Sequence, residues 1–474
     1  MRNIIILTSL LAAAACGGAT KGATIGTGKA PPPPPSIGAT NDIAEPGKPA
    51  AAKVEVSADA KKDYQAAVES FRNQDKGGSW SESACRSSAE RFQAVVRSHS
   101  DLIAAQFMVG LSYQRCNMNA EAESAYQQAS RMKGDATKAA MALSNLGQLY
   151  YKTGKVDAAR QYWDSAVKAN GKLIAARINL ASMNLEQMRK IKNPKDGSWK
   201  KLEEEARFNL SNALGVDTDS VEAYTVFGLI YMEGAQVNKN RLDLAKTLMD
   251  EANKRNPKYP PLLNAYGLYW MKKNSLNQAL QAFQGAVEGD PKFVEARVNA
   301  GLLTLGFRKY DAAKEFFAKA VELAPKNYDA TIGLGVALRG LNDLDGAEAQ
   351  YKKAQGIDGS RGDAYFNLGV LYKDFRANKQ NDPDQVAAIR KSVQVYRQAK
   401  EFFNQFLSKS GSDADKAEAK ENIKDCDKVV KQLEQFADAL AKMPKQPVEP
   451  PKPTPAPAPA GGTPPAGGAT PTKK

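Results

Sequence analysis

The chain has 474 residues, a formal net charge of +14 and a single histidine, His99. Because acid–base and metal chemistry rely heavily on histidine, this composition excludes a histidine-based triad or metal cluster. A mechanism that uses only carboxylates or lysine would need an acidic pair converging in one site, and no acidic cluster stands out. The sequence also lacks a GxxxxGK[ST] phosphate-binding loop. We therefore predict a protein that is not an enzyme and that has no catalytic residue, cofactor or metal.

Residues 1–15 combine one basic residue, a short apolar run and a run of alanines directly before Cys16. This composition is typical of an export signal, and the apolar run is too short for a mature transmembrane helix. Small residues immediately before a cysteine resemble the lipobox of bacterial lipoproteins. The resemblance implies that residues 1–15 are a lipoprotein signal peptide and that Cys16 is acylated, with palmitate as a candidate chain. The alternative is ordinary secretion, with cleavage near the alanine run.

The residues after Cys16 indicate a location and a tether. Gly17 follows the cysteine, where lipoproteins retained in the inner membrane of enteric bacteria have aspartate. By this resemblance we expect the chain on the periplasmic side of the outer membrane. Residues 16–56 are rich in Gly, Ala, Thr and Pro and have too few apolar side chains to pack. We interpret them as a disordered tether, which as a flexible coil would span on the order of 35 Å.

A period of 34 residues marks the central part of the chain. Its glycines are Gly267, Gly301, Gly335 and Gly369. After the first three of these glycines, an alanine, an aromatic residue and a second alanine follow at constant offsets, as Ala279, Phe283 and Ala286 do after Gly267. Glycine on one helix and alanines on the next let two backbones approach closely, and the aromatic ring fills the remaining gap. Since one such hairpin cannot bury its apolar stripe alone, the period predicts a stack of helical hairpins.

The clearest copy, SNLGQLYYKTGKVDAARQYWDSAVKAN at residues 144–170, resembles the tetratricopeptide repeat, a 34-residue helix-turn-helix. The resemblance implies an all-α, right-handed solenoid of eight to nine hairpins over residues 57–408. It also implies that the chain binds other proteins. Insertions interrupt three of the copies, and one of them contains a basic loop at residues 189–201.

In this family the first helix of each repeat lines a concave surface, and fixed offsets from the glycine point into it. The resemblance therefore implies a mostly apolar groove with a row of asparagines that could hold the backbone of an extended peptide. The predicted groove comprises Phe107, Leu111, Asn145, Asn179, Leu229, Leu268, Met271, Asn299, Leu302, Leu305, Ile332, Val336, Phe366, Asn367 and Val370. The alternative is that these residues pack on neighbouring first helices and that the asparagines are solvated.

The basic loop at 189–201 has two interpretations. It can be a solvated loop, or it can contact an anionic component of the cell envelope such as peptidoglycan. An exported chain ordinarily meets no nucleic acid, so we expect no nucleic-acid partner.

The cysteines beyond Cys16 suggest one disulfide. On the repeat frame, Cys85 opens the second helix of one unit and Cys116 closes the first helix of the next, so both lie near the same edge of the stack. We predict that they pair, because exported proteins occupy an oxidising compartment. Cys426 would then remain a free thiol on the last helix.

The C-terminal part divides into a helix and a tail. We predict a helix at residues 409–441 that caps the open end of the stack; the alternative is that its apolar face occupies the groove. Residues 442–474 are rich in proline and alanine, which predicts a disordered tail.

Together, the acylated tether, repeat scaffold and tail resemble repeat lipoproteins of bacterial envelope machines, including those of myxobacterial gliding motility. The resemblance implies a non-catalytic periplasmic adaptor held to the outer membrane through Cys16. Two alternatives stay open: a regulator of peptidoglycan-synthesis enzymes, and an assembly factor for an outer-membrane pore or a pilus.

Overall fold

The computed structural model describes residues 57–77, 80–191, 193–409 and 413–443. The predicted signal peptide, the acylated Cys16, the tether up to residue 56 and the tail beyond Met443 lie outside these residues. All regular elements of the described part are helical, which confirms the all-α prediction. None of the described helices is both long and apolar enough to span a bilayer.

The described helices form nine consecutive hairpins followed by one long helix. The first five hairpins are α1 (Ala58–Lys76) with α2 (Glu82–Ser98), α3 (Ile103–Arg115) with α4 (Asn119–Arg131), α5 (Ala136–Lys152) with α6 (Val156–Ala169), α7 (Ile174–Lys190) with α8 (Gly197–Val216), and α9 (Val221–Glu233) with α10 (Arg241–Arg255). The next three are α11 (Pro260–Lys272) with α12 (Leu276–Gly289), α13 (Val294–Gly306) with α14 (Tyr310–Leu323), and α15 (Tyr328–Gly340) with α16 (Leu344–Ile357). The ninth joins α17 (Asp363–Val370) to α18 (Gln385–Leu407), and α19 (Asp413–Ala441) follows.

The glycines permit the close packing that the repeat pattern predicts. A Cβ atom built on Gly147 would come within 2.5 Å of the Trp163 ring, and one on Gly335 within 2.5 Å of the Tyr351 ring. Gly301 has the same relationship to Phe317, at 2.8 Å. The ring of the second helix therefore packs directly against the backbone of the first.

Two kinds of turn recur along the stack. In five of the nine hairpins, one residue between the two helices has a left-handed backbone, as Gly154 (φ 79°) and Asn342 (φ 64°) do. Glycine and asparagine tolerate this conformation best. In five of the eight connections between hairpins, an Asn or Asp side chain instead accepts a hydrogen bond from the amide two residues later, as Asp290 does from Lys292 at 2.9 Å. Where they occur, these turns restrict the direction in which the next helix begins.

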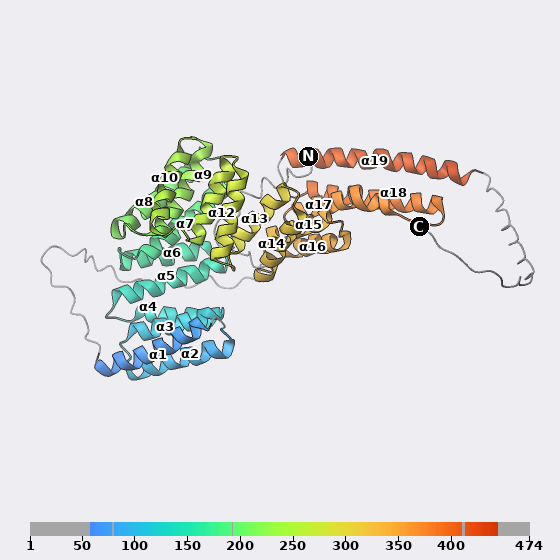
Figure 1. Ribbon diagram of the computed structural model, residues 1–474. Coiled ribbons are helices and arrows are strands. Elements are labelled where there is room, and N and C mark those ends of the chain that lie inside the picture. Colours follow the sequence, from blue (N-terminus) through green and yellow to red (C-terminus); the bar gives the residue numbers. More distant parts are fainter. Residues whose placement is uncertain (1–56, 78–79, 192, 410–412, 444–474) are drawn as a thin grey trace, which may run out of the picture.

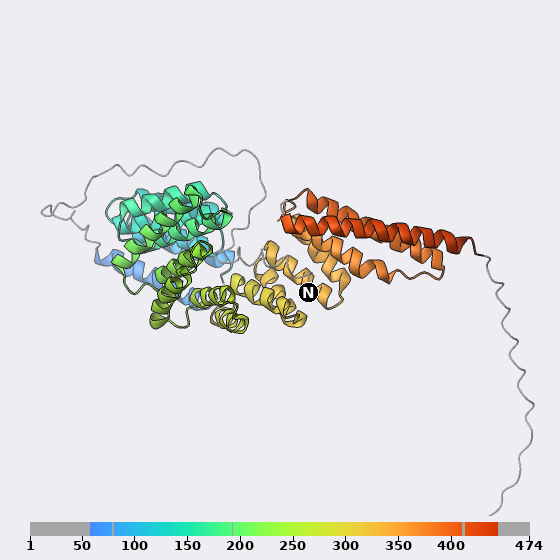
Figure 2. The same ribbon diagram turned by 90° about the horizontal axis from the view of Figure 1, so that it is seen from above.

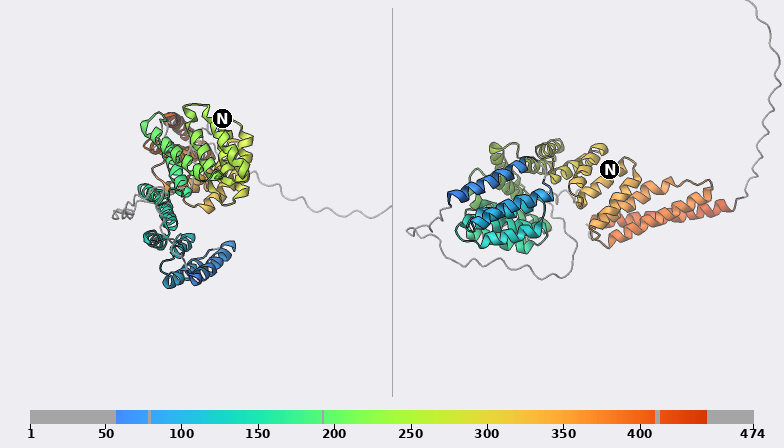
Figure 3. Two further views of the ribbon diagram at one scale, coloured as in Figure 1. Left: turned by 90° about the vertical axis from the view of Figure 1, so that its left-hand side faces the viewer. Right: turned by 90° about the horizontal axis from the view of Figure 1, so that it is seen from below.

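The hairpins are stacked in chain order and the stack bends. Figure 1 shows them rising from α1 to α10 and then continuing sideways through α11 to α17. The same bend is seen from above in Figure 2. α18 and α19 lie side by side, and this pair extends past α17 (Figures 1 and 3). α19 therefore packs along the last hairpin and does not occupy the predicted groove.

Candidate partner-binding surface

The predicted groove residues lie mainly inside the stack. Eleven of the fifteen are buried, among them Leu302, Ile332 and Phe366, and only Leu111, Asn145, Asn179 and Met271 are half-buried. The reason is that neighbouring first helices contact each other, as α13 does with α15 and α7 with α9. Side chains at the predicted offsets fill these contacts. The expectation of an open apolar groove along all these residues was therefore wrong, and the alternative of packing between first helices describes most of them.

Three of the four groove asparagines have structural hydrogen bonds. Asn145 Nδ2 donates to Tyr126 Oη at 3.0 Å. Asn299 Nδ2 donates to Asn264 Oδ1 at 2.9 Å, and both side chains are buried. Asn367 accepts from Arg339 Nη1 at 3.2 Å. Because each of these partners belongs to the preceding repeat, the asparagines join consecutive hairpins.

The accessible part of the predicted surface is a discontinuous strip on the first helices. Its half-buried members are Leu111 on α3, Asn145 on α5, Asn179 on α7 and Met271 on α11. Gln148, one turn after Asn145, is exposed. A partner that binds the first helices would contact this strip, not the buried residues between them.

The structure joins Cys85 and Cys116 in a disulfide, with their Cα atoms 6.3 Å apart. Cys85 is fully buried in the first turn of α2, and Cys116 is the C-cap residue of α3. The bridge thus connects the first hairpin to the second at the edge where each hairpin turns. Cys426 is a free, buried thiol on α19.

The basic loop is shorter and better anchored than the sequence suggested. α7 continues to Lys190 and α8 begins at Gly197, so Lys200 and Lys201 lie on a helix. Arg189 is paired with Glu233 at 3.3 Å, and only 10% of its side chain is exposed. Of the remaining lysines in this segment, Lys190, Lys195, Lys200 and Lys201 are exposed, whereas Lys192 lies outside the described residues.

A second buried ion pair fixes the start of α8. Arg241 Nη2 lies 2.6 Å from Glu203 Oε1, and the Glu203 side chain is only 8% exposed. Trp199 anchors the same helical turn in the core. The sequence does not predict these pairs, because Glu203 and Arg241 belong to different repeats.

Arg361 forms a structural cluster with its neighbours. Its guanidinium lies 3.9 Å from the centroid of the Tyr328 ring and forms ion pairs with Asp329 at 2.8 Å and Asp363 at 3.0 Å. Burial raises the pKa of the Asp329 carboxyl, and Arg361 opposes that rise. The cluster joins α15 to α17.

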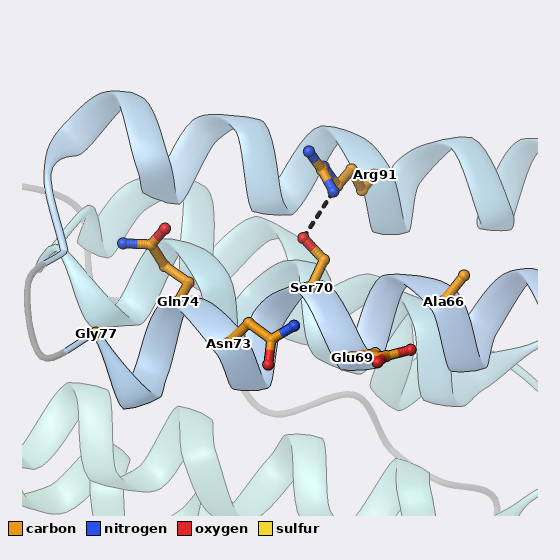
Figure 4. Close-up of a pocket in the computed structure, with 7 residues that line it drawn as sticks. All are labelled: Ala66, Glu69, Ser70, Asn73, Gln74, Gly77 and Arg91. Atoms are coloured by element: carbon orange, nitrogen blue, oxygen red, sulfur yellow. Dashed lines mark hydrogen bonds between the residues drawn. The ribbon is translucent and has the colours of Figure 1, made fainter.

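The described residues offer little that resembles a catalytic or metal site. They contain no group of three His, Cys, Asp or Glu side chains placed to hold a metal ion. A depression of about 590 Å³ lies at the first hairpin beside Glu69, Asn73 and Arg91. Arg91 Nη1 donates to Ser70 Oγ there at 2.6 Å (Figure 4). The depression is open to solvent. It is a polar surface hollow between α1 and α2.

Two segments match family models described as tetratricopeptide repeats, residues 110–174 and residues 305–368. The chain therefore contains tetratricopeptide repeats, and its hairpins form a solenoid of that kind. Among solved structures it is similar to a thermophilic TPR protein of Thermus thermophilus (24% identity, TM-score 0.37, 42% of this chain and 99% of that chain). It is also similar to PilF of Pseudomonas aeruginosa (16% identity, TM-score 0.37, 51% of this chain and 97% of that chain). A third similar structure is that of the human IFIT1 dimer with PPP-AAAA (15% identity, TM-score 0.45, 79% of this chain and 89% of that chain). None of the curated proteins compared with the chain matches it.

Proposed function

We propose that this chain is a non-catalytic scaffold of the bacterial cell envelope that binds partner proteins. The observation that carries the proposal is the run of nine hairpins, in which two segments match the tetratricopeptide repeat. Stacked repeats of this kind present an extended surface to other proteins. The accessible strip around Asn145, Gln148 and Met271 is one face at which such a partner would bind.

The proposed location is the periplasmic side of the outer membrane, with the chain anchored through acylated Cys16. The composition of residues 1–15 supports export. The Cys85–Cys116 disulfide supports an oxidising compartment, where such bonds persist. In this proposal residues 16–56 are the tether, 57–408 the repeat scaffold, 409–441 the cap and 442–474 a C-terminal tail.

The anchor is tested by replacing Cys16. Wild-type chain and Cys16→Ser are compared in cells fed a radiolabelled or clickable palmitate analogue, followed by separation of the membranes. Label on the wild-type chain and its recovery with the outer membrane, both lost in Cys16→Ser, support the proposal. Unlabelled wild-type chain in the soluble periplasmic fraction would refute the lipid anchor and favour ordinary secretion.

Gliding-motility machinery is the first candidate for the complex that the scaffold serves. Deletion of the chain would then give immobile cells with normal amounts of outer-membrane pore proteins and pili. Loss of one pore protein or of pili would instead favour the assembly-factor alternative.

The exposed Lys195, Lys200 and Lys201 are the feature that favours a regulator of peptidoglycan-synthesis enzymes. That alternative predicts that the chain sediments with purified cell wall at low salt. It also predicts that replacing the three lysines with glutamine abolishes sedimentation. Failure of the wild-type chain to sediment would refute the proposed contact with peptidoglycan.

A further inference from the structure

A cavity of about 550 Å³ lies between α2 and α4, the second helices of the first two hairpins. α3 packs against both helices and lies beneath the cavity (Figure 1). The bottom is apolar and buried, since Val109 is 1% exposed and Ala125 is 4% exposed. The volume falls within the range of small-ligand sites, roughly 300–1,000 Å³. The residues that line the cavity are different from those of the accessible strip on the first helices.

Five uncharged hydrogen-bonding side chains line the cavity and form two groups. In the first group, Gln93 Nε2 donates to Tyr113 Oη at 3.4 Å. In the second, Gln106 Nε2 donates to Gln128 Oε1 at 3.1 Å, and Gln128 Nε2 donates to Ser124 Oγ at 3.5 Å. The bonds donated by Gln93 and Gln128 are longer than the usual range of roughly 2.7–3.2 Å. A ligand that offers shorter bonds can therefore replace them.

The cavity is fixed in place by contacts outside these groups. Gln106 is only 6% exposed, and its Nε2 also donates to the Ala125 carbonyl of α4 at 3.3 Å. The Cys85–Cys116 disulfide joins α2 to the end of α3. The two helices that flank the cavity are thus both tied to α3, so the site is formed before a ligand arrives.

The charges around the cavity balance. Arg97 and Glu121 are the two charged side chains of the lining, and they have opposite signs. Glu121 lies 3.7 Å from Arg86, which is also paired with Glu82 at 2.7 Å. Two positive and two negative groups leave no net charge to attract an anion or a cation. An uncharged ligand matches this surface best.

The neutral groups indicate which kind of uncharged ligand fits. A glutamine side chain offers N–H donors and a carbonyl acceptor on one planar group, and an acetamido group offers the same pair in return. A sugar ring adds a flat C–H face for the apolar bottom and hydroxyls for Ser124 and Tyr113. An extended peptide also has amides, but peptide grooves add pockets for alternate side chains. This cavity is a single basin open to solvent, which suits a sugar ring better.

We propose that the cavity between α2 and α4 binds an uncharged carbohydrate chain that carries acetamido groups. Such sugars occur in cell-wall glycan and in surface polysaccharides, and the site recognises the chemistry that they share. This site is additional to the binding of partner proteins and does not depend on it.

The test is a binding titration of the purified full chain, followed by saturation-transfer difference NMR. The probe is N,N′,N″-triacetylchitotriose. The first comparison ligand is maltotriose, which has the same number of rings but no acetamido group. The second is N-acetyl-trialanine amide, an uncharged peptide.

Two variants, each with a matched control, locate the binding. Gln93→Leu with Gln128→Leu removes two hydrogen-bonding amides and nearly keeps their size. Its control is Gln161→Leu with Gln394→Leu, at exposed positions outside the cavity. Ser124→Tyr fills the cavity without a change in charge, and Gln161→Tyr places the same side chain at the equivalent position of α6. Circular dichroism checks that each variant keeps its helices.

The wild-type chain and both controls should bind the triacetyl sugar more tightly than either comparison ligand. One hydrogen bond contributes about fivefold to binding, so the two-glutamine variant should bind on the order of twentyfold more weakly. Ser124→Tyr should abolish binding. Competition by soluble glycan strands from purified cell wall would assign the natural ligand to the wall, and competition by delipidated surface polysaccharide would assign it to the cell surface.

Three results would overturn the proposal. They are no binding of the sugar by the wild-type chain, equal binding by the variants and their controls, and tighter binding of the peptide than of the sugar. None of them would affect the partner-binding function, which is measured without carbohydrate.

Discussion

The indole ring of Trp163 occupies the space that a side chain on Gly147 would need. A Cβ at residue 147 would lie 2.5 Å from two atoms of the ring, whose Nε1 donates to the Ser144 carbonyl at 3.0 Å. Gly147→Ala should therefore force the ring or the helix to shift and should cost about 1–3 kcal/mol of unfolding free energy. Thermal and urea unfolding, followed by circular dichroism, measure the loss.

Gly356 in α16 supplies the control, because a Cβ built there meets no atom within 4 Å. Gly356→Ala should be neutral or stabilising by up to about 1 kcal/mol, since alanine favours the helix. Equal destabilisation by both substitutions would contradict the argument from close backbone approach.

The Cys85–Cys116 bridge should stabilise the first hairpin more than the rest of the stack. It spans a sequence separation of 31 residues, and closing a loop of that size contributes about 3–4 kcal/mol in the chain-entropy model. Because repeats interact only with their neighbours, Cys85→Ser with Cys116→Ser should raise amide hydrogen exchange mainly in α1 to α3.

Exchange in α13 to α16 is the internal control and should not change. A uniform rise along the whole stack would show that the bridge acts globally, and no rise in α1 to α3 would show that packing alone holds the first hairpin.

The thiol of Cys426 should react slowly. Burial raises its pKa from 9.0 to about 11, so at pH 8 the thiolate fraction is lower by about a hundredfold than for a thiol of ordinary pKa. Alkylation with iodoacetamide, followed by peptide mass spectrometry, should show little labelling of Cys426 in the native chain. Labelling should increase as the pH rises towards 11 and become rapid in denaturant. Fast native labelling at pH 8 would mean that α18 does not cover this residue of α19.

Replacing only one partner of the Glu203–Arg241 pair should lower the free energy of unfolding markedly. Arg241→Met leaves a buried carboxylate without its partner, which typically costs about 3–5 kcal/mol. Adding Glu203→Gln removes the unpaired charge and should recover part of that loss. A double-mutant cycle measured by chemical unfolding gives the coupling energy; a value near zero would show that the pair contributes little to joining α8 and α10.

The fold could be predicted because its cause is local and repeated. In each hairpin a small residue such as Gly147 faces a large ring such as that of Trp163, and this difference in size lets the two helices pack closely. Because the pattern is repeated along the chain, it also predicts that the hairpins stack. The accessibility of the predicted groove could not be obtained this way. The offset of Leu302 from Gly301 gives the face on which it lies, but not how closely α13 approaches α15.

The basic segment shows a second limit of the sequence. Its charges suggested an open loop, but the partner of Arg189 is Glu233 in the next hairpin, and Trp199 draws the following turn into the core. Pairings between repeats depend on the rotation from one hairpin to the next, which the repeat pattern alone does not provide.

Site-specific photocrosslinking in living cells tests the central claim most directly. A photoreactive residue is placed at Gln148 or Met271 on the accessible strip, with buried Leu302 as the control. A scaffold that binds partners through its first helices should give a discrete adduct with another protein from the strip and none from residue 302. Absence of any protein adduct from Gln148 and Met271, with the chain present at its normal level, would contradict the account.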